Sequence, residues 1–179
     1  TQNMSFLIRL ATQADAPQAV RVVRAVYDEY GFSWDAEDYH ADLYDLQSHY
    51  FDAGHRFWVA EQNNVVLATV GLHLFRPLTG EVGQIVEHEN QRRIGGTDCS
   101  LERLYVHPEA RKAGIGQALM RTVTGEAKSA GKRTMEIWSD KRFEAAHRLY
   151  QRFGAEVIAD RICDDPDESP EWGLLIRLY

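Results

Sequence analysis

The chain has few of the residues that hold small proteins together covalently or through metals. Cys99 and Cys163 are its only cysteines among 179 residues, and their number and spacing fit neither a disulfide framework nor a metal knuckle. The seven histidines include no His-x-x-x-His pair of the kind that binds zinc on a helix. We therefore expect reduced thiols, as in a cytoplasmic protein, and no metal cofactor.

Long hydrophobic runs and an excess of positive charge are also missing. No stretch approaches the roughly 18 consecutive apolar residues that a membrane-spanning helix needs, which argues against a membrane partner. The formal net charge is -7 at pH 7, whereas domains that bind nucleic acid usually carry a basic stripe. Because 44% of the residues are hydrophobic, disorder is excluded, and residues 1–179 are expected to form a single globular domain.

Hydrophobic periodicity predicts a mixed sheet with helices on its faces. Apolar runs predict strands at residues 6–10, 57–61, 65–74, 101–106, 135–138, 157–162 and 173–178. Helical spacing predicts helices at residues 16–30, 38–51, 114–130 and 143–153. Asp15 is expected to cap the first helix and Gly31 to end it.

A polar stretch between residues 77 and 97 separates two of the predicted strands. It contains Gly80, Gly83, Gly95 and Gly96, and we expect a loop or an irregular hairpin there. Its length exceeds that of most connections between elements, and long ordered loops are often functional.

The segment from Val106 to Gly116 has the features of an anion site, because the chain leaves a predicted strand and enters a predicted helix. The first N–H groups of a helix have no partner within it, and the aligned peptide dipoles add partial positive charge. Gly114 and Gly116 leave room for a phosphate. Arg111 and Lys112 add charge at the mouth. The segment predicts a phosphate site, although alone it fits an ordinary helix start equally well.

Two other phosphate-binding loops fit this segment less well. A P-loop requires Gly-Lys-Ser/Thr, but Gln117 follows Gly116, so that interpretation is excluded. A dinucleotide fingerprint requires a third glycine where Leu119 stands, although Glu136 lies near the position at which that fingerprint places an acidic residue. A dinucleotide-dependent oxidoreductase is therefore a distant alternative.

Two motifs in the second half of the chain carry a resemblance to a known family. Residues 111–116 match the pattern Arg/Gln-x-x-Gly-x-Gly/Ala, and residues 146–154 match Ala-x-x-Leu-Tyr-x-x-x-Gly. With the strand-like residues 104–108 before them, they make the chain resemble the GNAT superfamily of acyl-CoA N-acetyltransferases. The resemblance implies an α/β (α+β) fold of three layers, in which helices flank a central mixed, mostly antiparallel sheet.

The same resemblance implies roles for particular residues. Acetyl-CoA would be the acetyl donor, and its pantetheine arm would pair with the backbone of Leu104, Tyr105 and Val106. Its pyrophosphate would bind the backbone N–H groups of Arg111, Lys112, Ala113, Gly114, Ile115 and Gly116. Tyr150 would face the sulfur atom of the departing coenzyme and act as general acid.

Two positions depart from the family's pattern. Phe143 stands where many members have an asparagine that contacts the cofactor, and Ser100 stands where some members have a glutamate base. A base is nevertheless needed, because an alkyl amine with a pKa of about 10 is mostly protonated at pH 7. Residues two apart in a strand share a face, so Ser100, Glu102, Leu104 and Val106 are expected on one side. Glu102 is therefore the predicted general base.

Other residues have both a functional and a structural interpretation. Glu102 is also typical of a half-exposed strand residue that pairs with Arg103 or another neighbour, and Glu87, His88 and Glu89 in the polar stretch are rival bases. Lys141 and Arg142 either reach the phosphates or lie solvated in a first helical turn, and His107 is expected to be structural. The early aromatic residues fit a core more often than an acceptor pocket; they are Trp34, Tyr39, Tyr44, His49 and Tyr50.

The sequence thus predicts an N-acetyltransferase that moves an acetyl group from acetyl-CoA to a primary amine by direct attack in a ternary complex. No motif identifies the acceptor, which is a small molecule or a protein. The departures at Phe143 and Ser100 leave open a catalytically silent domain that binds acyl-CoA as a sensor or partner module. A homodimer is expected from the habit of the family.

Overall fold

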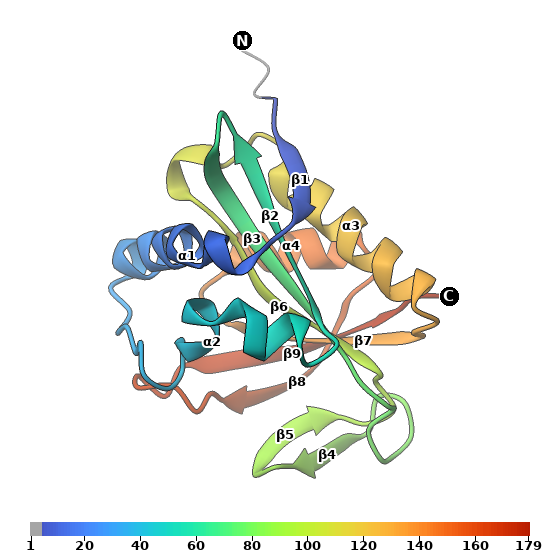
Figure 1. Ribbon diagram of the computed structural model, residues 1–179. Helices are drawn as coiled ribbons and strands as arrows, with labels where there is room; N and C mark the ends of the chain where they lie inside the picture. Colours follow the sequence, from blue (N-terminus) through green and yellow to red (C-terminus); the bar gives the residue numbers. More distant parts are fainter. Residues whose placement is uncertain (1–4) are drawn as a thin grey trace.

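The computed structural model describes residues 5–179; residues 1–4, which the single-domain prediction includes, lie outside the described part. A seven-stranded sheet runs through it in the order β1-β2-β3-β6-β7-β9-β8 (Figure 1). Its strands are β1 (Leu7–Leu10), β2 (Arg56–Gln62), β3 (Val65–Leu74), β6 (Cys99–Val106), β7 (Thr134–Asp140), β8 (Glu156–Ile162) and β9 (Pro170–Arg177). Only the β6–β7 pair is parallel, which confirms the predicted mixed, mostly antiparallel sheet.

Helices cover both faces of this sheet. They are α1 (Ala16–Tyr30), α2 (Ala41–Tyr44), α3 (Ile115–Ser129) and α4 (Glu144–Arg152). Alternate residues of β2 enter opposite cores: Phe57 and Val59 pack with α1 and α2, whereas Trp58 and Ala60 pack with α3 and α4. This period of two is what a sheet with both faces buried requires, and it makes the three layers.

The turns and helix ends follow local chemistry in most places. Asn63 and Asn64 have φ angles of 51° and 66° and join β2 to β3 in the tight turn that Asn-Asn favours. Gly31 ends α1 in the left-handed conformation, with a φ of 72°. The polar stretch forms a hairpin of β4 (Ile85–His88) and β5 (Gln91–Ile94), which projects from one end of the molecule (Figure 1).

Two local predictions were wrong. The helix expected at residues 38–51 is broken at Asp45, and α2 is followed by a separate π-helical turn at Gln47–Phe51. The Asp15 side chain does not cap α1. It accepts a hydrogen bond from the Thr12 N–H (2.8 Å) and pairs with Arg9 (2.8 Å), because a cation from β1 offers it a charged partner.

The two central strands β6 and β7 separate soon after they meet. Within the described residues they pair only at Cys99 with Met135 and at Ser100 with Glu136. Beyond Ser100, β6 continues to pair with β3 on its other side. The edge of β6 that faces β7 therefore has backbone groups without a strand partner, and a gap opens in the sheet.

A β-bulge at Arg103 changes which side chains share a face of β6. Arg103 has a φ of 49°, and the register jumps so that Gly71 opposes Glu102 while Thr69 opposes Tyr105. An extra residue in one strand reverses the alternation that follows it. Glu102 therefore shares its face with Tyr105. Leu104 and Val106 pack into the α3 core on the other face, contrary to the prediction.

A buried ion pair accompanies the bulge. The Arg103 guanidinium donates to both carboxylate oxygens of Asp42, at 2.8 and 3.1 Å, and to the Tyr39 carbonyl at 2.6 Å. The Tyr50 hydroxyl donates to the same carboxylate at 2.6 Å. The side chains of Arg103 and Asp42 are only 11% and 19% exposed. This cluster ties β6 to α2 at the strained position.

Replacing Asp42 with alanine should lower the free energy of unfolding by about 3 kcal/mol, because it leaves a buried guanidinium without a counter-ion. Urea unfolding measures this loss. The matched control is Asp28→Ala on the exposed side of α1, which should change stability by no more than about 0.5 kcal/mol. Equal effects of the two changes would contradict the importance of the pair.

The same pair should show in the pH dependence of stability. Burial opposes ionisation of Asp42, but Arg103 and the Tyr50 hydroxyl together hold the pKa of that carboxyl below its usual range. A lowered pKa adds stability above the unfolded pKa, and the added stability is lost as the pH falls through the folded one. The difference between the wild type and Asp42→Ala should therefore be constant at neutral pH and shrink below about pH 4.

Candidate active site

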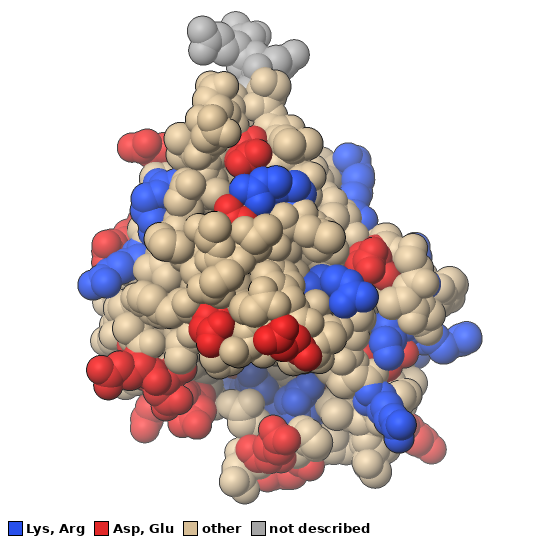
Figure 2. Space-filling model, in the orientation of Figure 1, with Lys and Arg blue, Asp and Glu red and all other residues tan. Residues whose placement is uncertain are grey.

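The gap between β6 and β7 opens into a cavity of about 1070 Å³. Its wall runs from the loop before α3, past β6, β7 and α4, to β9 and the β4–β5 hairpin. The face shown in Figure 2 is hollowed between the body of the molecule and this hairpin, and basic side chains are visible in the hollow. A cavity of this size can hold a large ligand along the gap.

One end of the cavity is the loop that leads into α3. His107 begins it, and its Nδ1 accepts a hydrogen bond from the Glu109 N–H (3.2 Å), in the structural role predicted. Lys112 and Gly114 have φ angles of 66° and 82°, which turn the backbone before the helix. Within the described part of the chain, the backbone N–H groups of residues 111–117 have no hydrogen-bond acceptor; the first such bond is from Ala118 to Gly114 (3.1 Å).

Glycine at position 116 keeps this end open. A Cβ there would lie 3.1 Å from Cδ2 of Leu149 on α4, so a side chain would crowd the contact between α3 and α4. Gly125, in the middle of the same helix, has nothing within 4 Å of an added Cβ. Of the two glycines of α3, only Gly116 therefore lies where a side chain would meet another element.

The two cations predicted at this end, Arg111 and Lys112, both line the cavity. Arg111 pairs with Glu29 of α1 (2.7 Å), and Arg152 also lines the cavity. Lys141 instead pairs with Asp160 (3.0 Å). Arg142 pairs with Asp140 (2.7 Å) and lies over the Phe32 ring.

Neither Lys141 nor Arg142 is part of the cavity wall. Acidic side chains close to them in the fold compete for their charge, so they do not reach the phosphate end.

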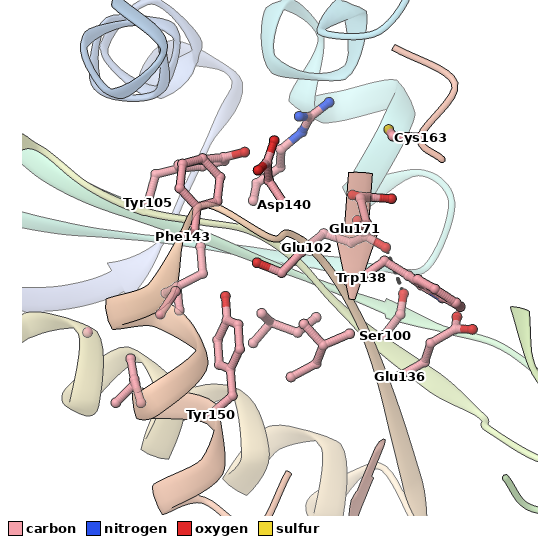
Figure 3. A pocket seen from close by; sticks show the side chains of 18 of the residues that line it. Ser100, Glu102, Tyr105, Glu136, Trp138, Asp140, Phe143, Tyr150, Cys163 and Glu171 are labelled. Carbon is pink, nitrogen blue, oxygen red and sulfur yellow. Dashed lines mark hydrogen bonds between the residues drawn. The ribbon is translucent and has the colours of Figure 1, made fainter. Parts of the chain in front are cut away.

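Tyr150 lies in the middle of the cavity wall. It is on α4, is 3% exposed, and points its hydroxyl toward the space between Phe143 and Glu102 (Figure 3). Burial raises the pKa of Tyr150 above its ordinary value, and repulsion from the neighbouring Tyr105 and Glu102 raises it further. The phenol is therefore protonated at neutral pH and can donate a hydrogen bond or a proton.

Glu102 faces the same cavity from β6. Its Oε1 accepts a hydrogen bond from the Ser100 hydroxyl (2.8 Å; Figure 3) and lies 3.5 Å from Nδ1 of His73. Its side chain is 36% exposed. Arg103 pairs with Asp42 and not with Glu102, so the structural interpretation holds only in its other form, a half-exposed glutamate that contacts other neighbours. Glu102 is left as an accessible carboxylate with two polar neighbours on one oxygen.

The rival bases lie farther away. Glu87, His88 and Glu89 are exposed at the tip of the β4–β5 hairpin, and only the last two border the cavity. Besides Asp140 and Asp165, sequence reasoning missed two other carboxylates in the wall. Glu136 is buried and accepts from Arg93 and from the Ile94 N–H, both at 2.7 Å, so it anchors the hairpin to β7.

Glu171 on β9 is the second carboxylate that was missed. It pairs with Arg161 (2.9 Å), and burial raises its pKa despite that partner. Its place near Glu102 (Figure 3) depends on the crossing of β9 to the far side of β7. Placing Glu171 at the site requires the strand order of the sheet, and hydrophobic periodicity does not predict that order.

Aromatic side chains fill the position of the family's asparagine. Phe143 packs edge-on against Tyr30 of α1, with 4.9 Å between ring centroids, and lies 6.0 Å from Tyr105. Among the early aromatics, Tyr39 borders the cavity and Tyr50 is core. Trp34 stacks on His40, while Tyr44 and His49 are exposed. The prediction of core residues is thus right for Tyr50 and in part for Trp34 and Tyr39, which pack against the core, and it is wrong for Tyr44 and His49.

The remaining features are the two cysteines, possible metal ligands and possible membrane-spanning helices. Cys99 and Cys163 are both buried and unlinked, as predicted. Among residues 5–179, no three His, Cys, Asp or Glu side chains are grouped as metal ligands would be. The helices in this part of the chain are too short or too polar to span a membrane.

Comparison with known proteins gives a consistent result. Residues 21–155 match the model of the acetyltransferase (GNAT) family. The uncharacterized N-acetyltransferase YjgM of Escherichia coli (strain K12) is 29% identical over 156 residues, which cover 86% of this chain and 84% of YjgM.

Solved structures share the fold. A GNAT-family acetyltransferase of Staphylococcus aureus Mu50 superimposes with a TM-score of 0.74 at 18% identity, covering 98% of this chain and all of the other (100%). The yncA protein of Salmonella typhimurium, solved with its cofactor acetyl-CoA, gives 0.70 at 19% identity over 97% of this chain and 94% of its own. With the family model matched over most of its length, the chain belongs to the GNAT family and is an N-acetyltransferase by class.

Proposed function

We propose that residues 1–179 act as one domain that transfers an acetyl group from acetyl-CoA to a primary amine by direct attack in a ternary complex. One observation carries this proposal: a single cavity joins the free N–H groups of residues 111–117 to Tyr150 and Glu102. The anion site would bind the phosphates of the donor, and the acid–base pair would move the protons of the reaction. The Salmonella relative with bound acetyl-CoA supports the choice of donor.

The cofactor would lie along the gap in the sheet. Its pyrophosphate would accept hydrogen bonds from the N–H groups between Arg111 and Gly116, where the dipole of α3 adds positive charge. Its pantetheine arm would pair with the open edge of β6 at Leu104, Tyr105 and Val106, as an added strand does. Phe143 would contact this arm only through its ring, since it offers no polar group.

The chemistry follows from the two groups in the middle of the cavity. Glu102 would take a proton from the ammonium form of the acceptor, and the neutral amine would attack the thioester carbonyl. A backbone N–H near Val106 would stabilise the oxyanion. When the tetrahedral intermediate collapses, the C–S bond breaks and Tyr150 would give its proton to the leaving sulfur.

Charge favours a positively charged acceptor. The chain has a net charge of -7. Of the carboxylates that line the cavity, Glu171 is paired with Arg161, whereas Glu102 and Asp165 have no Lys or Arg partner among the described residues. A negative field raises the local concentration of cations, and the ammonium form of an amine is such a cation. The acceptor is therefore proposed as a small-molecule or protein amine.

The first test is release of CoA thiol from acetyl-CoA with a panel of amines that includes monoamines, diamines, amino acids and lysine peptides. We expect acetylation of at least one amine and binding of acetyl-CoA in the micromolar range that is common for substrates. Tight binding with no turnover on the whole panel would support the alternative, a silent sensor of acyl-CoA.

Tyr150→Phe should lower kcat about a hundredfold, the usual size of a lost general acid, while the Kd of acetyl-CoA changes less than about threefold because the ring is kept. Tyr179→Phe, at a tyrosine that is 73% exposed, is the matched control and should be as active as the wild type. An unchanged kcat in Tyr150→Phe would remove this residue from the mechanism.

Gly116→Ala should weaken acetyl-CoA binding about tenfold or more, equal to about 1.4 kcal/mol, because its methyl group crowds Leu149 of α4 and displaces the first turn of α3, which lines the cavity. Gly125→Ala in the same helix should leave binding unchanged and raise stability by about 1 kcal/mol through helix propensity. Calorimetric titration and urea unfolding separate the two effects. Equal affinities in the two variants would argue against the proposed pyrophosphate site.

A further inference from the structure

We propose that His73 receives the proton that Glu102 takes from the acceptor amine and passes it to solvent. The inference rests on the proposed function and adds a residue that no motif indicated. Nδ1 of His73 lies 3.5 Å from Oε1 of Glu102, and its side chain is 35% exposed in the wall of the cavity. It thus connects the carboxylate to water.

The reaction itself requires such an exit. An ammonium group brings three protons on nitrogen, and the amide product keeps one. One of the others leaves on the thiol of CoA by way of Tyr150, which is reprotonated, and the second must reach bulk solvent. The balanced equation is R–NH3+ plus acetyl-CoA giving R–NH–acetyl, CoA–SH and one proton. Glu102 is accessible in the empty cavity, but the bound amine and acetyl-CoA would cover it, so its proton would then need a partner that carries it to solvent.

The neighbours of His73 hold its ring for this purpose. On one side it stacks on His55, with 4.3 Å between ring centroids and an interplanar angle of 28°. On the other it meets the Tyr50 ring at 5.4 Å. Both partners come from segments next to β2, so the imidazole is held at the edge of the cavity by packing rather than by a competing ion pair.

His55 cannot take over the task. Its Nδ1 accepts a hydrogen bond from the Leu74 N–H (3.0 Å), so the neutral ring carries its proton on the other nitrogen. Burial, and secondarily His73, lower the pKa of His55 to about 4. His55 is therefore neutral at physiological pH, and His73 is the imidazole that lies beside Glu102.

The Ser100 hydroxyl completes the arrangement. It donates to Oε1 of Glu102, the same oxygen that His73 approaches. No described residue donates a hydrogen bond to Oε2, which is left for the substrate amine. Oε2 would thus collect the proton, and rotation of the protonated carboxyl group would bring the proton to the side of Ser100 and His73, where His73 accepts it. The departure from glutamate at position 100 gains a role, because the shorter serine leaves room for this pair.

The test is His73→Gln, which keeps a hydrogen-bonding side chain but cannot exchange protons. With the best amine of the panel, kcat should fall about tenfold or more, with the KM of acetyl-CoA unchanged. Added imidazole, a diffusible proton carrier, should restore most of the lost kcat. If no panel amine reacts, hydrolysis of acetyl-CoA to acetate, CoA and a proton gives the same readout with water as the acceptor.

A double-mutant cycle separates a relay from a packing role. Because His73 acts through Glu102, His73→Gln should cost nothing further in a Glu102→Gln background. His49→Gln, at an exposed histidine outside the cavity, is the matched control and should be fully active and insensitive to imidazole. Thermal unfolding of each variant checks that the fold is kept.

Three results would overturn the relay. They are a fully active His73→Gln, a loss that imidazole does not restore, and additive losses in the double variant. If Glu102→Gln retains full kcat, the assignment of Glu102 as the base in the proposed function fails as well. Acetyl-CoA binding and the effect of Tyr150→Phe do not depend on either result, so they test the rest of the proposed function separately.

Discussion

The separation of β6 from β7 is the constraint on which the site depends. The two strands pair at Cys99 and Ser100 and then part, so backbone groups in the centre of the sheet have no strand partner. Buried backbone polar groups are costly when unpaired, and a gap of this kind persists only where something else can satisfy them. The same divergence creates the cavity and gives β6 one free edge inside the protein.

The bulge at Arg103 determines what faces that gap. Without the extra residue, Leu104 and Val106 would follow Glu102 on one face; with it, Tyr105 does. A non-glycine residue at a φ of 49° costs of order 1–3 kcal/mol. The pairing of Arg103 with Asp42, in a segment 61 residues earlier, offsets this strain. The same pairing removes Arg103 from Glu102 and leaves that carboxylate accessible.

Sequence reasoning succeeded where the cause of a structure is local and failed where the cause lies in another part of the chain. Asn63-Asn64, Gly31 and the glycines of residues 114–116 act locally, and the strands and helices around them were placed within a few residues. The positions that failed are set by partners in other elements. The bulge is accompanied by the pair of Arg103 with Asp42 of α2, and Asp15 pairs with Arg9 of β1. Glu171 and His73 reach the site only through strand order, which periodicity does not contain.

An acidic chain that holds a phosphate ligand must separate its charges, and the structure suggests how. On the proposed function, the pyrophosphate rests on backbone N–H groups and a helix dipole, which no titration or mutation of a single side chain removes. Arg111 is partly neutralised by Glu29, so side-chain cations contribute less than their number implies. The carboxylates Glu102, Asp165 and Glu171 also line the cavity, and Glu171 is paired with Arg161. On the same proposal, fixed dipoles would attract the anionic donor while Glu102 and Asp165 would attract the ammonium acceptor, so that one cavity could accept two substrates of opposite charge.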